Sequence, residues 1–311
     1  MAPKINKKIA VAVKALVSIG ILYALFSKAG IFKVFALFKT INIYYFAAAA
    51  LLYVVSLYVS SLRLRLILEN RFGVYKLFCI NMIGAFFNNV LPGSTGGDAV
   101  KLYYVYRHTG DGVLAAGSVF LDRYVGFFTL LVIGFTASIM GFTKLSGTGV
   151  EYLMPFFIVS FVAGSYFVFG LRIGRRFMFV RKFHDYFRIY IGRFRLIRNT
   201  IAISIAVQIT CIVCVYCVSK SLGAAVAFRD MLTFVPIVIV IASIPISISG
   251  LGVREGAFVL LFRLIGVKED MAMAISFLWF LSYSIPSTLG LYYYFRYKPT
   301  LQKAEMETSE T

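Results

Sequence analysis

The stretch PISISGLGVREGAF, from Pro245 to Phe258, decides how this chain must fold. It follows MLTFVPIVIVIAS, an apolar run suited to a membrane interior, yet it contains a proline, three glycines and an Arg–Glu pair. An ionisable side chain at the centre of a membrane helix costs about 2.5–3.5 kcal/mol on insertion scales, so such residues usually face a cavity and pair. The stretch therefore predicts a broken helix that places Arg254 and Glu255 against a polar cavity.

The composition is that of an integral membrane protein. The 311 residues are 60% hydrophobic and only 14% charged, whereas soluble proteins are about half apolar and one-quarter charged. Several apolar runs approach the roughly 20 residues that a membrane-spanning helix needs. The sequence therefore predicts an all-α, polytopic membrane protein with about six to eight transmembrane helices. Full spans are expected at 9–26, 42–62, 114–141, 152–171, 199–220 and 271–295.

A second break lies in the first half of the chain. Residues 77–91, LFCINMIGAFFNNVL, are short for a span and end in PGSTGGD, which begins at Pro92. Proline and glycine stop a helix, and Asp98 suits the start of the next one. Both breaks predict re-entrant hairpins, in which two half-helices meet inside the membrane. The expected hinge and cavity-backbone residues are Pro92, Gly96, Gly97, Pro245, Gly250, Gly252 and Gly256.

The charge pattern predicts the topology. Lys and Arg number 32 against 13 Asp and Glu, and basic residues of membrane proteins gather in cytoplasmic loops. With both termini cytoplasmic and both hairpins re-entrant, most basic residues fall on the cytoplasmic side of the cell membrane.

This topology predicts an inverted repeat. Within one transmembrane domain, 1–298, residues from about 152 to 298 repeat the order of spans in residues 1–141 with the opposite orientation in the membrane. Paired broken segments in inverted halves indicate a transporter's central site. The polar tail 299–311 is expected to be disordered.

The segment that joins the halves is strongly basic. Residues 172–198 contain nine Lys or Arg interleaved with aromatic residues. This pattern is typical of an interfacial helix that lies on anionic lipid headgroups. A solvated cytoplasmic loop is the alternative, and no nucleic-acid partner is expected.

The ionisable residues at the two breaks and in the adjoining span are the candidate substrate-binding site. Arginine matches phosphate oxygens in a bidentate way, so Arg123 and Arg254 are expected to bind a phosphate headgroup. The carboxylates would pair with these arginines or contact a cationic headgroup. Internal salt bridges that only lock the hairpins are the alternative. The candidate residues are Asp98, Lys101, Asp122, Arg123, Arg254 and Glu255.

The sequence contains no recognisable catalytic or metal-binding motif. Cys211, Cys214 and Cys217 are spaced three apart, as small apolar residues on one helix face. His108 and His184 lie far apart in the sequence. The glycine patterns at the breaks lack the surrounding βαβ unit or the Lys-Ser/Thr of nucleotide-binding loops. We therefore expect no metal, no cofactor and no enzymatic activity.

The motifs at the breaks resemble those of a known family. LPGSTGGDAVKLYYVYRHTG, AAGSVFLDRYVGFFTLL and PISISGLGVREGAFVLLFRLIGV are similar to the signature regions of the lysylphosphatidylglycerol synthase transmembrane-region family. That family includes the flippase domain of bacterial multiple peptide resistance factors. Lys101 and Asp122 stand where arginine and glutamate are commoner, and both keep the charge. The resemblance implies a lipid-handling domain with re-entrant helices that forms a homodimer, and it does not imply aminoacyl transfer.

The sequence thus favours a lipid transporter of the flippase type, which moves a phospholipid or another phosphate-bearing lipid. An accessory subunit, partnered by a lipid-modifying enzyme in cell-envelope glycolipid assembly, or a membrane-embedded enzyme remains the alternative. An ion channel is less favoured, because no span shows a polar stripe that could line a pore.

Overall fold

The computed structural model describes residues 31–91, 96–170, 178–244 and 250–297, together with Gly20 and Tyr23. The described residues form helices and no strand, which confirms the all-α prediction. The predicted span at 9–26, apart from Gly20 and Tyr23, and the tail at 299–311 lie outside the described residues. The helices are α2 (Ile31–Leu37), α3 (Ile43–Ile67), α4 (Val74–Val90), α5 (Gly96–Thr109), α6 (Gly112–Met140), α7 (Phe142–Leu145), α8 (Leu153–Ser165), α9 (Met178–Gly192), α10 (Phe194–Ser221), α11 (Phe228–Ser243), α12 (Val253–Arg263), α13 (Glu269–Ser287) and α14 (Leu289–Arg296).

Within the described part of the chain, five segments are long and apolar enough to cross a membrane. They are Ile43–Ile67, Gly112–Met140, Val150–Phe169, Phe194–Ser221 and Glu269–Arg296. These segments confirm a multi-pass helical membrane protein. The first helix runs past residue 62, where the expected span ended, and takes in Arg63. The sequence placed the boundary at the first charged residue, but Arg63 is buried and paired in the bundle, so the helix continues through it.

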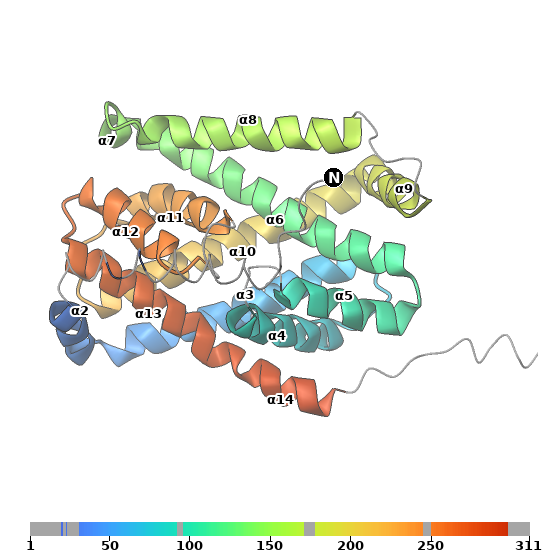
Figure 1. Ribbon diagram of the computed structural model, residues 1–311, viewed down its shortest axis with the longest axis horizontal. Helices are drawn as coiled ribbons and strands as arrows, with labels where there is room; N and C mark the ends of the chain where they lie inside the picture. The colour runs from blue at the N-terminus through green and yellow to red at the C-terminus, as the bar shows by residue number, and fades with distance from the viewer. Residues whose placement is uncertain are drawn as a thin grey trace, which may run out of the picture.

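Two helical hairpins enter the bundle from opposite ends (Figure 1). The pair α4 and α5 breaks after Val90, and the pair α11 and α12 breaks after Ser243, where the sequence predicted breaks. At 1.5 Å per residue, α5 and α12 rise about 21 and 17 Å, less than the roughly 30 Å of a hydrocarbon core. Each hairpin therefore reaches only part of the way through the bundle.

The order of helices in the first half recurs in the second half in the opposite direction. A long helix, a hairpin and a second long helix form α3, α4–α5 and α6, and the same order forms α10, α11–α12 and α13. Helices α3 and α10 pack along each other and run in opposite directions (Figure 1). This arrangement matches the inverted order that the sequence predicts.

The main hydrophobic core lies around the second hairpin. Phe234 of α11, Phe258 and Phe262 of α12 and Ile275 of α13 are fully or almost fully buried in it. A smaller cluster joins α4 and α5 to the end of α3 through Leu64, among others. Both hairpins are thus held by their own apolar contacts, which positions the residues at their breaks.

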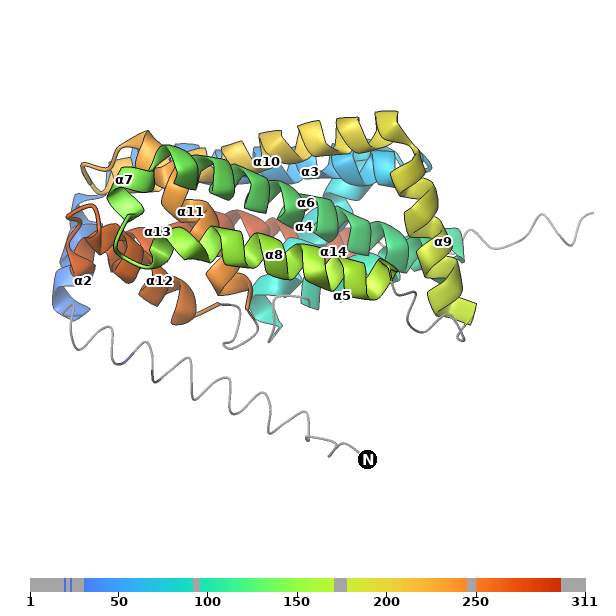
Figure 2. The same ribbon diagram turned by 90° about the horizontal axis from the view of Figure 1, so that it is seen from above.

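Helix α9 lies across one end of the bundle, at a steep angle to the long helices (Figure 2). Phe187 and Tyr190 on one face are buried, while Arg181, Lys182 and Arg188 on the other face are exposed. The buried face packs on α6, where the rings of Tyr124 and Phe187 are 5.4 Å apart. The described part of the segment 172–198 is therefore an amphipathic helix followed by the first turn of α10, and its contact with lipid headgroups stays a prediction.

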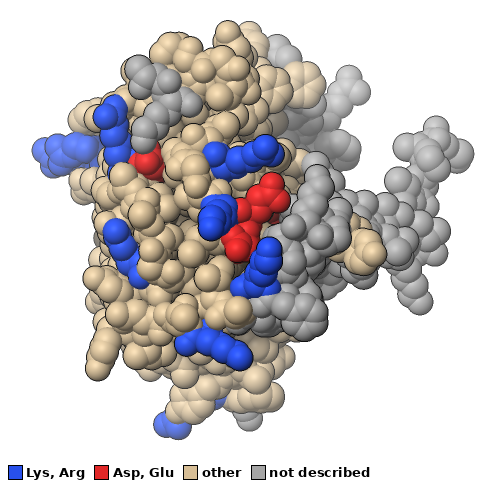
Figure 3. Space-filling model, turned by 90° about the vertical axis from the view of Figure 1, so that its left-hand side faces the viewer, with Lys and Arg blue, Asp and Glu red and all other residues tan. Residues whose placement is uncertain are grey.

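The two ends of the bundle differ in charge among the described residues. At the end formed by α7, α12 and the start of α13, basic and acidic side chains lie next to each other (Figure 3). At the opposite end, which carries α9 and the C-terminal part of α14, basic residues predominate. Those at the second end are Arg65, Arg71, Lys76, Arg107, Arg181, Lys182, Arg188, Arg193, Arg195, Arg198 and Arg296, with Glu69, Asp111 and Asp185 as the acidic residues.

Candidate functional site

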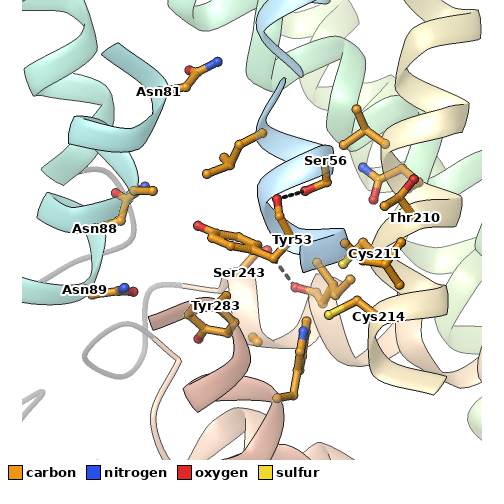
Figure 4. A pocket seen from close by; sticks show the side chains of 18 of the residues that line it. Tyr53, Ser56, Asn81, Asn88, Asn89, Thr210, Cys211, Cys214, Ser243 and Tyr283 are labelled. Carbon is orange, nitrogen blue, oxygen red and sulfur yellow. Dashed lines mark hydrogen bonds between the residues drawn. The ribbon is translucent and has the colours of Figure 1, made fainter. Parts of the chain in front are cut away.

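A cavity of about 410 Å³ is lined by residues of both hairpins. Its walls come from α3, α4, α10, α11 and α13 (Figure 4), with single residues from α5, α6 and α12. Asn88 and Asn89 in the last turn of α4 and Ala242 and Ser243 at the end of α11 all line it. The helix ends that precede both predicted breaks therefore face one cavity, and its volume is in the range of small-molecule sites.

The charged residues among the described lining are all cations: Lys101, Arg123 and Arg254. They come from three different helices, α5, α6 and α12. None of the three candidate carboxylates is among the lining residues, because each is turned toward a basic partner. The structure thus brings the three predicted cations together at one cavity and places the predicted acids behind them.

At the first break, Asp98 holds the two cations of the α5–α6 side. Its carboxylate lies 2.6 Å from the Nε of Arg123 and 4.0 Å from the Nζ of Lys101. Asp98 stands in the first turn of α5, where the helix dipole favours a negative charge. The Arg123 side chain is still 51% exposed, so the ion pair positions this guanidinium at the cavity without enclosing it.

At the second break, Arg254 and Glu255 form a buried ion pair. The Nη2 of Arg254 lies 2.5 Å from the Oε1 of Glu255, and its Nη1 donates to the hydroxyl of Tyr283 at 2.5 Å. The guanidinium also lies over the rings of Trp279 and Phe280. Glu255 accepts a hydrogen bond from the backbone N–H of Gly252, which caps α12. Through Ser276 and Tyr283 the Arg254 guanidinium links α12 to α13, and Arg254 also lines the cavity.

Asp122 does not pair with its neighbour Arg123. It pairs with Arg63 of α3, whose Nε lies 2.7 Å away and whose Nη1 donates to Ser204 of α10 at 2.8 Å. These two neighbours on α6 face different helices, Asp122 toward Arg63 of α3 and Arg123 toward Asp98 of α5. The predicted span ended at residue 62 and so missed Arg63, which links α3, α6 and α10 in the structure.

We expect Arg63→Lys to destabilise the protein by about 1.5–3 kcal/mol, the usual contribution of a hydrogen bond to a charged group. Lysine keeps the charge, but a single ammonium cannot reproduce the forked contact with both Asp122 and Ser204. The measurement is unfolding of the purified protein in detergent. Arg71→Lys is the matched control, since Arg71 lies 3.7 Å from Glu69 and is exposed. Equal stability of the two variants would contradict this assignment.

The glycines at the breaks serve two different purposes. Gly250 and Gly252 have φ of +77° and +85°, conformations that other residues rarely adopt, so they make the turn into α12. Gly97 instead permits a close approach, because a Cβ added there would lie 1.9 Å from the carbonyl oxygen of Gly84 in α4. Gly256 lies inside α12, where an added Cβ meets nothing within 4 Å.

The remaining predicted backbone residues are less informative. Gly96 begins α5, where an added Cβ would lie 2.7 Å from the side chain of Leu91. Pro92 and Pro245 lie outside the described residues.

The cavity contains polar residues that sequence reasoning did not select. Asn81, Asn88 and Asn89 of α4 line one side and face Tyr53 and Ser56 of α3 (Figure 4). The sequence could have identified these asparagines as a polar face of α4, since intervals of seven and eight residues place all three on one side of a helix. Gln208 of α10 and Tyr283 of α13 also line the cavity, and nothing in their local sequence distinguishes them.

Comparison with known proteins supports the resemblance inferred from the motifs. The model of a family described as the lysylphosphatidylglycerol synthase TM region matches residues 11–290 of this chain. The chain is also similar to the UPF0104 membrane protein PH1989 of Pyrococcus horikoshii, with 24% identity over 300 residues. That alignment covers 84% of this chain and 90% of the relative. The region matched by the family model contains both hairpins and all the candidate site residues.

Proposed function

The chain belongs to the lysylphosphatidylglycerol synthase transmembrane-region family, and from this premise we propose that it moves a phosphate-bearing lipid between membrane leaflets. The observation that carries the proposal is the cavity lined by residues of both hairpins. Lys101, Arg123 and Arg254 are the charged side chains of its described lining. A cationic cavity inside an apolar bundle suits an anionic headgroup whose acyl chains stay in the lipid. The proposal assigns transport to this cavity and no chemical step.

Lys101 and Arg123 are the side chains that we propose contact the phosphate. Both are held by one carboxylate, Asp98, so together they leave a positive charge at the cavity. Arg123 is half exposed, whereas Arg254 has a side chain only 4% exposed and is engaged by Glu255 and Tyr283. We therefore assign phosphate binding to Lys101 and Arg123, and assign to Arg254, whose charge Glu255 balances, a structural role in the cavity wall.

The inverted hairpins supply a route for alternating access. They reach the cavity from opposite ends of the bundle (Figure 1), and the central sites of many transporters lie between such broken helices. Rocking of one hairpin against the other would open the cavity toward one leaflet at a time.

The charges at the ends of the bundle support an orientation. Basic residues of membrane proteins gather on the cytoplasmic side, and the end that carries α9 is the more basic among the described residues. Helix α14 also ends there. We propose that this end is cytoplasmic, that both chain termini lie on that side, and that the protein resides in the cell membrane.

Transbilayer movement of lipid in proteoliposomes tests the function. Liposomes would contain phospholipids labelled with a fluorophore on one acyl chain, and dithionite would quench the label that reaches the outer leaflet. We expect the wild-type protein to accelerate this movement and Lys101→Ala or Arg123→Ala to slow it at least about tenfold, because each removes a charge-assisted hydrogen bond. Arg263→Ala is the control, since Arg263 is exposed and lies 4.0 Å from Glu269.

Folded wild-type protein that moves no tested phospholipid would contradict the transport proposal and favour an accessory role. Movement that Lys101→Ala and Arg123→Ala leave unchanged would place the route outside this cavity.

A further inference from the structure

Three carboxamides of the cavity wall are held in one orientation by their partners. The Nδ2 of Asn81 donates to the Oγ of Ser61, which itself donates to the carbonyl of Leu57. The Oγ of Ser61 is therefore an acceptor, and the NH₂ group of Asn81 must face it. The Oδ1 of Asn81 then points the other way, and it has no hydrogen-bond partner among the described residues although Asn81 is fully buried.

Asn89 and Gln208 repeat this arrangement. The Nδ2 of Asn89 donates to the Oγ of Ser287, whose own hydrogen goes to the carbonyl of Ser284. The Nε2 of Gln208 donates to the backbone carbonyl of Gly126. In each case the NH₂ group of the amide donates to an acceptor of the protein, so the carbonyl oxygen points away from that acceptor. Asn89 and Gln208 therefore present carbonyl acceptors at the cavity wall, which need hydrogen-bond donors from a ligand. Asn88 is held the opposite way, since its Oδ1 accepts from the backbone N–H of Gly97.

The carboxamide-bearing face of α4 lies beside a cation. The side chain of Lys101 crosses α4 at Gly84, where an added Cβ would lie 2.7 Å from its Cε, one turn from Asn81 and from Asn88. A ligand that satisfies this wall must therefore combine an anionic group with nearby donors. A phosphodiester supplies the anion but has no hydrogen-bond donor of its own, whereas a sugar or inositol supplies several hydroxyl donors.

Aromatic rings form another wall of the same cavity. Tyr53, Trp279 and Tyr283 line it, with the rings of Tyr53 and Tyr283 5.8 Å apart and those of Trp279 and Tyr283 6.0 Å apart. The C–H face of a pyranose or inositol ring packs well on aromatic carbon, while its hydroxyl edge remains free to hydrogen-bond. An aromatic wall together with amide acceptors fits a cyclic polyol.

We propose that the lipid headgroup is a cyclic polyol phosphate, such as a glycosyl phosphate or inositol phosphate. This inference rests on the proposed function and names its substrate class. Lys101 and Arg123 hold the phosphate, the carboxamide oxygens of Asn89 and Gln208 accept hydrogen bonds from the ring hydroxyls, and the aromatic side chains support the ring. A site built to bind hydroxyls discriminates strongly against an analogue that lacks them, because its buried acceptors are then left unpaired.

The chain's only tryptophan lies in the cavity and provides the assay. The full-length protein in detergent would be titrated with glycerophosphoinositol, glycerol 3-phosphate and free myo-inositol while Trp279 fluorescence is followed. We expect glycerophosphoinositol to bind at least about tenfold more tightly than either of the others. Asn89→Ala and Gln208→Ala should each lower its affinity and leave that of glycerol 3-phosphate unchanged. Both residues are only partly buried, so the fold should survive, as a thermal melt would verify.

Asn199→Ala is the matched control, because Asn199 is exposed at the start of α10 and does not line the cavity. Equal affinity for glycerophosphoinositol and glycerol 3-phosphate would overturn the polyol inference and leave the phosphate proposal intact. Tight binding of myo-inositol alone would overturn the requirement for phosphate. Binding of none of the three by folded protein would overturn both the inference and the cavity on which the proposed function rests.

Proteoliposomes separate a lipid headgroup from a free sugar phosphate. We expect acyl-labelled phosphatidylinositol to cross the bilayer at least about tenfold faster than phosphatidic acid, which has a phosphate but no polyol. A preference for glycerophosphoinositol in solution without movement of phosphatidylinositol would overturn the lipid assignment in favour of a soluble sugar phosphate.

Discussion

Glu255→Gln is expected to lower the free energy of unfolding by about 3–5 kcal/mol, the usual cost of breaking a buried ion pair. Glu255 has no exposed surface, and its carboxylate neutralises Arg254 while capping α12 through the N–H of Gly252. Glutamine retains the shape and an acceptor for that cap. It leaves the Arg254 guanidinium as an uncompensated charge against Trp279 and Phe280. Unfolding of the purified protein in detergent measures the effect.

Glu269→Gln is the matched control. Glu269 also stands in the first turn of a helix and near an arginine, 4.0 Å from Arg263, but it is exposed. Exposed ion pairs contribute little, typically less than about 1 kcal/mol. If both glutamine variants had the stability of the wild type, Arg254 and Glu255 would not be the lock of the second hairpin, and Arg254 would be available to bind the substrate directly.

Gly97→Ala is expected to destabilise the first hairpin by about 3 kcal/mol or more, at or above the upper end of typical overpacking costs. The added Cβ would lie 1.9 Å from the carbonyl oxygen of Gly84, which is backbone and cannot rotate away. Helices α4 and α5 would have to separate, and Asp98 in the next position would shift with its two cations. We therefore expect lower thermal stability in detergent and slower lipid movement in proteoliposomes.

Gly256→Ala separates this packing effect from the general effect of removing a glycine. Gly256 lies in a helix where an added Cβ meets nothing within 4 Å. Replacing a glycine by alanine inside a helix usually stabilises by about 0.5–1 kcal/mol. A destabilised Gly256→Ala variant, or a Gly97→Ala variant as stable as the wild type, would contradict the close contact between Gly97 of α5 and Gly84 of α4.

The sequence by itself determined the architecture. Long apolar runs have one low-energy solution in a membrane, a helix that satisfies its own backbone hydrogen bonds, so the described spans fall close to the predicted ones. The two helix breaks could also be predicted from the sequence, because proline, glycine and paired charges are unfavourable within a continuous membrane helix. Local chemistry also marked Arg254 and Glu255 as an adjacent pair, and the two side chains do meet.

Only the tertiary structure decided which of the other charges pair and which face the cavity. Asp122 selects Arg63, 59 positions away, because the packing of α3 on α6 brings them within 2.7 Å. The orientation of the asparagine and glutamine amides likewise depends on acceptors supplied by distant segments, such as Ser287 for Asn89. Hydrophobicity and helix breaking act over a few residues and can be deduced along the chain. Partner choice among polar groups depends on distances across the bundle, which exist only once the helices have packed.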